Sequence, residues 1–130
     1  MSDEQWRQFF LLCNRILGKG HAVAEFSESW CAWTTFERLS RDAGYWTAGL
    51  PGTEDVLSTC IGDSGVWGQP FPFQEIAHLI IPKQFYWERI EPGSFANGSK
   101  PQDLTRLAQA LEGARLPHRV TESVLEVKLY

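Results

Sequence analysis

The chain has 130 residues, of which 22% are charged and 43% hydrophobic, and its formal net charge is −4. These values are typical of one globular domain over residues 1–130 and exclude intrinsic disorder. The negative charge argues against a nucleic acid as the main ligand, because phosphate neutralisation requires clustered Lys and Arg, and it suits either a basic partner or simple solubility.

The first predicted element is an amphipathic helix from Asp3 to Leu17. Ser2 and Gln5 fit a capping box, in which each residue satisfies a free backbone N–H of the other. Gly18 and Gly20 follow, and glycine favours the end of a helix because it adopts the left-handed conformation without steric cost.

The next segments are expected to be extended or irregular. His21–Phe26 alternates in polarity and predicts a strand. Cys31–Leu39 also predicts a strand, although Trp30, Trp33 and Phe36 recur at a helical spacing. The stretch from Arg41 to Asp63 is rich in turn-forming residues and predicts a long connection with a helical turn near Glu54–Cys60.

Ile76–Ile81 is a continuous apolar run interrupted only by His78, which predicts a central strand covered on both faces. Gln84–Ile90 is expected to form the neighbouring strand, and the Pro, Gly and Asn residues of 92–98 to form a loop.

The last third predicts a helix from Pro101 to Glu112, then a closing hairpin of Leu116–Val120 and Val124–Tyr130. The order of elements favours an α+β fold. It should be a single domain with a mostly antiparallel sheet, on which the N-terminal helix and the helix near the C-terminus pack.

Three cysteines are present, Cys13, Cys31 and Cys60, without the spacing of a zinc site or a disulfide framework. The N-terminus lacks the pattern of a secretion signal, and no apolar run approaches membrane-spanning length. We therefore expect a cytoplasmic protein with free thiols and no membrane contact.

Six tryptophans are the most informative residues. Spacing assigns Trp6, Trp33 and Trp87 to the core. Trp46 and Trp67 lie among Gly and Pro residues, where regular structure is disfavoured, and the sequence leaves open whether Trp67 is exposed. The predicted partner-binding residues are Trp46, Trp67, Asp55 and Asp63, which would form an acidic, aromatic surface.

No complete catalytic or metal-binding pattern is present, so no catalytic residue, cofactor or metal ligand is predicted. Gly62-Asp63-Ser64-Gly65 resembles the nucleophile segment of trypsin-like serine proteases, but the other parts of that site are missing, which favours a polar turn. His21, His78 and His118 are not spaced as metal ligands. An alternative is a small hydrolase or transferase in which His78, His21 and nearby carboxylates line a pocket.

The segment Gln69-Pro70-Phe71-Pro72-Phe73-Gln74-Glu75-Ile76-Ala77-His78-Leu79-Ile80-Ile81, with the opening Glu4-Gln5-Trp6-Arg7 and the terminal Leu116-Pro117-His118, resembles small bacterial proteins of the toxin-immunity type. The resemblance implies a non-catalytic inhibitor that binds a cognate protein toxin, which the negative charge suggests is basic. The chain would act as a monomer, or as a homodimer if Val124–Tyr130 is an unprotected strand edge.

Overall fold

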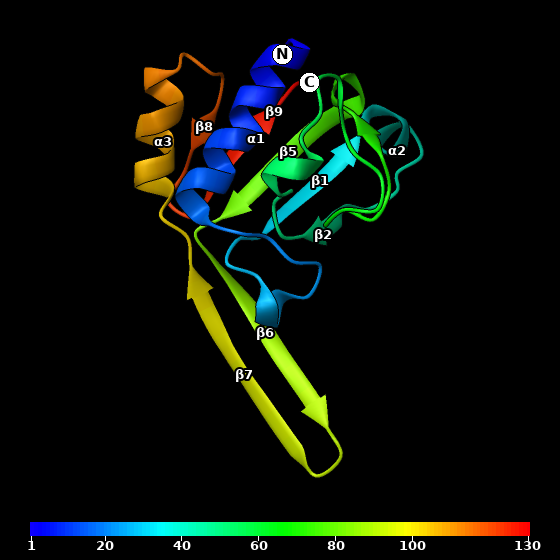
Figure 1. Cartoon of the computed structure of the whole chain (residues 1–130), viewed down its shortest axis with the longest axis vertical. Coiled ribbons are helices and arrows are strands. Elements are labelled where there is room, and N and C mark those ends of the chain that lie inside the picture. Colours follow the sequence, from blue (N-terminus) through cyan, green and yellow to red (C-terminus); the bar gives the residue numbers. More distant parts are fainter.

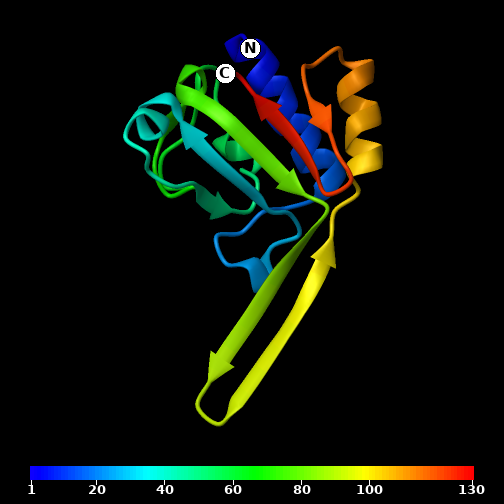
Figure 2. The ribbon, with the colours of Figure 1, turned by 180° about the vertical axis from the view of Figure 1, so that it is seen from behind.

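The computed structural model describes all 130 residues and has the predicted α+β fold (Figure 1). A five-stranded antiparallel sheet has the order β2-β1-β5-β9-β8. Helices α1 and α3 lie on one face of this sheet, and the reverse view in Figure 2 shows the other face without a helix. The elements are α1 (Asp3–Leu17), η1 (Ala24–Phe26), β1 (Cys31–Thr35), α2 (Phe36–Ser40), β2 (Trp46–Ala48), η2 (Thr53–Asp55), β3 (Cys60–Ile61), β4 (Phe71–Pro72), η3 (Phe73–Glu75), β5 (Ile76–Pro82), β6 (Gln84–Glu91), β7 (Ser94–Pro101), α3 (Leu104–Gly113), β8 (Arg119–Val120) and β9 (Val124–Lys128), where η marks a 3₁₀ turn.

The first helix is as the sequence predicts. The Gln5 backbone N–H donates to Ser2 Oγ at 3.1 Å and the Ser2 N–H donates to Gln5 Oε1 at 2.9 Å, which completes the capping box. Gly18 ends the helix with a φ of 96°, a conformation that suits glycine. The apolar face is buried and consists of Trp6, Phe9, Phe10, Cys13 and Leu17.

The strand predicted for residues 21–26 is absent, and the strand predicted for residues 31–39 is shorter than expected. Residues 21–26 form a loop with the 3₁₀ turn η1 and no strand, because the Phe26 and Ser27 N–H groups donate within the turn to the Val23 and Ala24 carbonyls and the His21 N–H donates to Ser27 Oγ at 2.8 Å. Strand β1 ends at Thr35, whose Oγ1 accepts from the Arg38 N–H and caps the short helix α2.

Strand β5 is central in the sheet, as its apolar run predicts, and β9 pairs with it along its length. β9 lies between β5 and β8, but β8 covers this edge only where Arg119 and Val120 pair with Glu126 and Leu125, so the homodimer alternative stays a prediction. The helix predicted near the C-terminus is present as α3. Asp103 caps it, because its Oδ1 accepts from the Arg106 N–H at 3.0 Å.

The sequence predicts that β6 lies beside β5 in the main sheet, and this prediction is wrong. Strand β6 pairs with β7 in full register, from Gln84 opposite Pro101 to Glu91 opposite Ser94, and the two strands project from the body as a separate hairpin (Figures 1 and 2). This hairpin, residues 84–101, is called the arm below. Its length follows from the rise of about 3.4 Å per residue in antiparallel strands, which gives roughly 25 Å for its eight-residue strands.

The predicted loop over 92–98 contracts to the Pro92-Gly93 turn, where Gly93 has the φ of 78° that such a turn requires. Asn97 and Gly98 lie inside β7, because Trp87 on the opposite strand packs over Gly98: a Cβ there would be 2.8 Å from Trp87 Nε1. Trp87 is therefore a half-buried residue of the arm and not part of the core, contrary to its assignment from spacing.

The core contains most of the aromatic residues. Trp33 stacks on Trp67 with ring centroids 3.7 Å apart and planes within 8° of parallel. Phe10 and Phe71 meet the Trp67 ring edge-on, and its indole Nε1–H donates to the Gly49 carbonyl at 3.0 Å. Only 7% of Trp67 is exposed, which settles the question that the sequence leaves open: Trp67 is a core residue.

Replacing this ring should therefore destabilise the protein. We expect Trp67→Ala to lower the free energy of unfolding by about 3–5 kcal/mol, the usual cost of removing a buried Trp or Phe side chain. Urea unfolding followed by circular dichroism measures the change, and Leu57→Ala, at an exposed side chain, is the matched control. A Trp67→Ala protein with wild-type stability would contradict the core assignment.

Candidate functional site

The four residues predicted to bind a partner do not form one acidic, aromatic surface. Trp67 is buried, and the half-buried ring of Trp46 packs against Phe71 at 4.9 Å. The guanidinium of Arg38 lies over the Trp46 ring, 3.8 Å from its centroid. The surface next to Trp46 thus carries charges of both signs, since Glu37 and Glu75 line the same hollow as Trp46 and Arg38, and the predicted Asp55 and Asp63 are not among them.

The two predicted aspartates stabilise local loops. Asp55 is half-buried, and its Oδ2 accepts from the Val66 N–H at 3.3 Å. Asp63 is exposed, and its Oδ1 accepts from the Ser64 N–H at 2.9 Å in a turn with a φ of 63° at Ser64. The Gly-Asp-Ser-Gly segment is accordingly the polar turn that the sequence favours, and Asp55 holds the loop that leads to Trp67.

Exposed apolar side chains gather instead around the arm. Ten large apolar residues are exposed, and half of them belong to the arm or to the loop of residues 21–27. These five are Val23 (46% exposed), Phe26 (64%), Tyr86 (55%), Ile90 (75%) and Phe95 (57%). A concentration of this kind on one projecting element is typical of an interaction surface.

Strand alternation divides the arm into two faces. Ile90 lies directly opposite Phe95, and Tyr86 shares their face because side chains at even spacing point the same way. Glu88 also lies on this outer face, between Tyr86 and Ile90. The outer face thus combines the apolar side chains of Tyr86, Ile90 and Phe95 with Glu88 and the exposed polar side chains of Asn97 and Ser99, and no other part of the chain covers it.

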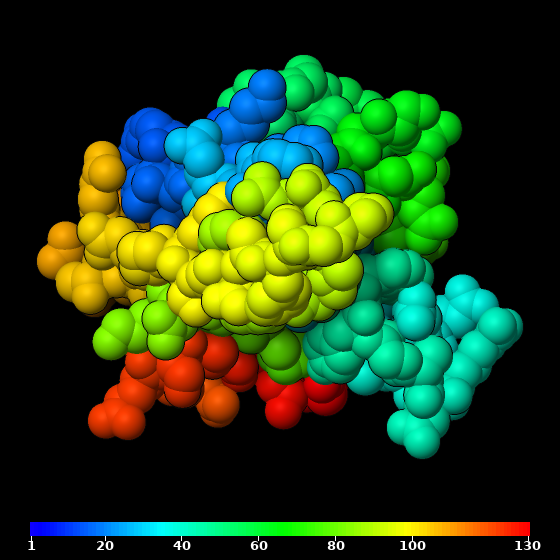
Figure 3. All heavy atoms as spheres, turned by 90° about the horizontal axis from the view of Figure 1, so that it is seen from below, coloured from blue at the N-terminus to red at the C-terminus, as the bar shows by residue number.

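The inner face is attached to the body. At its base Phe85 stacks on Trp30, with centroids 5.7 Å apart. Lys100 donates from Nζ to the carbonyl oxygens of Ala24, Glu25 and Ser27, at 3.2, 2.5 and 2.8 Å. Farther along, Arg89 pairs with Glu25 at 3.1 Å. Figure 3, which looks along the arm from its tip, shows the loop in blue lying against the arm in yellow.

The base of the arm is fixed by one buried amide. Gln102 Oε1 accepts from the Trp30 N–H at 3.0 Å, while Nε2 donates to the carbonyl oxygens of Trp30 and Pro82 at 3.0 and 2.9 Å. Because these groups are buried, each hydrogen bond would be costly to lose. The amide joins the ends of both arm strands to the start of β1, so the arm leaves the body in a defined direction.

A second polar cluster lies on the helix-free face of the sheet. Tyr45 Oη is 2.7 Å from His78 Nδ1, and Glu126 Oε2 is 3.5 Å from His78 Nε2. Glu126 also pairs with Arg119 at 3.2 Å. Burial raises the pKa of Tyr45 to about 12, with Tyr130 and Glu126 acting in the same direction, and the tautomer of His78 determines which partner donates in the bond between Tyr45 Oη and Nδ1.

This cluster provides part of what the enzyme alternative requires. It brings a histidine near a carboxylate, but none of the surface hollows is lined by His78 or His21. His21 Nδ1 accepts from the Val23 N–H, and the nearby carboxylate of Glu25 pairs with Arg89. His118 contacts the Leu116 carbonyl at 2.8 Å.

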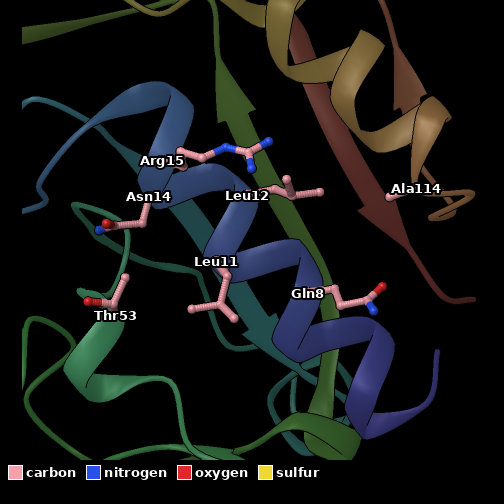
Figure 4. A pocket seen from close by; sticks show the side chains of 7 residues that line it. All are labelled: Gln8, Leu11, Leu12, Asn14, Arg15, Thr53 and Ala114. Atoms are coloured by element: carbon pink, nitrogen blue, oxygen red, sulfur yellow. The ribbon is translucent and has the colours of Figure 1, made fainter.

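The largest hollow, about 740 Å³, runs along the outer side of α1 between η2 and α3 (Figure 4). Its lining consists of Gln8, Leu11, Leu12, Asn14, Arg15, Thr53 and Ala114. Arg15 is the one ionisable residue among them, so the hollow contains no acid–base pair. No three His, Cys, Asp or Glu side chains lie close enough together to hold a metal ion, the three cysteines are free, and no helix is long and apolar enough to cross a membrane.

Comparison with known proteins finds no family model, no curated protein and no solved structure that matches this chain.

The buried histidine predicts a pH dependence of stability. Burial lowers the pKa of His78 below its ordinary value of 6.5, and Lys128 and Arg119 lower it further, while Glu126 opposes the shift. Since the unfolded state then binds more protons than the folded state, stability is fully present above pH 6.5 and is lost as the pH falls through the folded pKa. We expect the free energy of unfolding to decline from pH 7 to pH 5.

Urea titrations at several pH values measure this decline. His78→Gln should flatten it, whereas His118→Gln, at a half-buried histidine outside the cluster, should leave it unchanged. An equal decline in wild type and His78→Gln would assign the pH dependence to other groups.

Proposed function

We propose that this chain is a non-catalytic protein-binding module, an inhibitor of the toxin-immunity type, and that the arm is its contact surface. The observation that carries the proposal is the uncovered apolar strip of Tyr86, Ile90 and Phe95 on a projecting hairpin. The resemblance of the sequence to small bacterial immunity proteins supports the class of function. The proposal includes action in the bacterial cytoplasm.

The energetics of the strip support binding. Complete burial of an exposed Ile or Phe side chain contributes roughly 1.5–3 kcal/mol, so the three residues of the strip would supply a large part of the binding energy, as a few central anchors commonly do. The arm is also fixed before binding, by Gln102 at its base and by Lys100 along its inner face. Preorganisation of this kind lowers the entropy that association costs.

One carboxylate of the arm has no cationic partner. The two cations, Arg89 and Lys100, are engaged with the loop of residues 21–27, and Arg89 also pairs with Glu91 at 3.9 Å. Glu88 pairs with no cation and accepts a hydrogen bond from the Tyr86 hydroxyl at 3.3 Å. An acidic, aromatic surface for a basic toxin is therefore available on the arm, at residues other than those that the sequence suggests. Charge of this sign accelerates association with a basic protein.

The proposed function is tested with a toxin candidate encoded beside this chain in its genome. The candidate is expressed from an inducible promoter, and co-expression of this chain should restore growth. Purified proteins should form a complex whose dissociation constant is measured by calorimetry. Failure of the wild-type chain both to bind such candidates and to protect against them would reject the inhibitor function.

Changes on the strip should weaken binding without unfolding the protein. We expect Ile90→Ser combined with Phe95→Ser to raise Kd by about 100-fold, equivalent to roughly 2.7 kcal/mol, because two exposed anchors lose their burial in the partner. The melting temperature should change little.

Val120→Ser is the matched control, since Val120 is also exposed, at 46%, but lies on β8 away from the arm. It should leave Kd unchanged. A double arm variant that binds as tightly as the wild type would show that the strip is not the contact surface.

A further inference from the structure

We propose that the arm and the loop of residues 21–27 act together as a two-sided wedge, which enters a groove with apolar walls and a basic rim on the partner protein. This inference rests on the proposed function, and it identifies the shape and the chemistry of the partner surface. The residues that carry it are Phe26 on one side of the arm and Ile90 and Phe95 on the other.

Apolar side chains are exposed on both sides of the wedge. The outer face presents Tyr86, Ile90 and Phe95. The inner face is covered by the loop toward the base, where Lys100 and Arg89 hold it, while Glu91 and Ser94 near the tip are exposed, and the loop itself exposes Phe26 and Val23. Phe26 has 64% of its surface exposed despite contact with the His21 ring, so it remains available to a partner.

A flat partner surface can bury one of these sides but not both. A groove can bury both, because its two walls meet opposite sides of the inserted element. A two-stranded hairpin is narrow, and the arm extends well beyond the body, as Figures 1 and 2 show from opposite directions. Concave sites with apolar walls are where proteins commonly bind ligands, so a wedge of this form suits the blocking of such a site.

Charge determines the expected rim. Glu88 is on the outer face without a cationic partner, and Glu91 is beside the turn at the tip, 3.9 Å from Arg89, which also pairs with Glu25 of the loop. A groove that accepts this tip would place its own charged residues near Glu88 and Glu91. Complementarity therefore requires Lys or Arg residues at the rim.

Lys100 is a positioning residue for the inner side. Its ammonium donates three hydrogen bonds to carbonyl oxygens of one short loop and pairs with no carboxylate. Charged donors make stronger hydrogen bonds than neutral ones, so loss of Lys100 should release the loop. Phe26 would then lose its fixed position, whereas Ile90, on the opposite side, would keep its own.

A double-mutant cycle tests this arrangement with the purified toxin candidate that binds the wild-type chain. Phe26→Ser and Lys100→Gln should each raise Kd by about 10-fold, and their combination should raise it by hardly more than either alone, because both remove the same contact. Ile90→Ser combined with Lys100→Gln should instead be additive. Val120→Ser is again the control.

Glu25→Gln provides a second way to loosen the loop, since it weakens the pair with Arg89 and leaves Lys100 in place. It should also raise Kd and should also be non-additive with Phe26→Ser. This variant keeps the test decisive if Lys100→Gln destabilises the base of the arm.

The outcomes separate the wedge from the binding function. If Ile90→Ser weakens binding and Phe26→Ser does not, the contact is one-sided and the wedge is overturned while the inhibitor function stands. If neither weakens binding to a partner that does bind, the arm is not the contact surface. A Kd that does not rise with salt, or with Glu88→Gln and Glu91→Gln together, would overturn the basic rim.

Discussion

A two-stranded β-ribbon has no interior, and this constraint determines which side chains of the arm are exposed. Each of its side chains is exposed unless another element covers it, and isolated hairpins are only marginally stable in water. Here the inner face is covered at the base by Trp30 and farther out by the loop that Lys100 holds. The outer face has no such cover, so Ile90 and Phe95 are in solvent. An apolar strip that folding leaves exposed is most simply explained by a partner that covers it.

The tryptophans divide differently from what their local sequence suggests. Glycine and proline near Trp67 indicate an irregular segment, and the segment is irregular, but it returns Trp67 onto Trp33 and buries it. Irregular backbone therefore does not imply an exposed side chain when a hydrogen bond, here to the Gly49 carbonyl, and a stacked ring hold the segment in the core. The aromatic residues on which the proposed function rests are the less conspicuous Tyr86, Phe95 and Phe26.

Sequence patterns predict the parts of the fold that local chemistry determines. The capping box and apolar face of α1, the apolar run of β5 and the terminal hairpin are all recognisable, because each depends on neighbours along the chain. The arm cannot be recognised in this way, because tertiary contacts such as those of Gln102 decide whether β6 pairs with β5 or with β7. Asn97-Gly98 resembles a turn, yet Trp87 packs over Gly98 and keeps it in a strand. One feature of the sequence does indicate a hairpin here. Pro92-Gly93, a pair typical of turns, lies between two segments of similar length in which apolar residues such as Ile90 and Phe95 have polar neighbours.

Hydrogen exchange of the arm, free and in complex with the toxin candidate, tests the central claim most directly. In the free protein the backbone amides near the Pro92-Gly93 turn should exchange rapidly, because only the hairpin itself protects them, while those of α1 exchange slowly. On binding, protection should rise in residues 86–97 and in the loop of residues 21–27, with little change in α1. Protection that appears around Trp46 and leaves the arm unchanged would contradict the account.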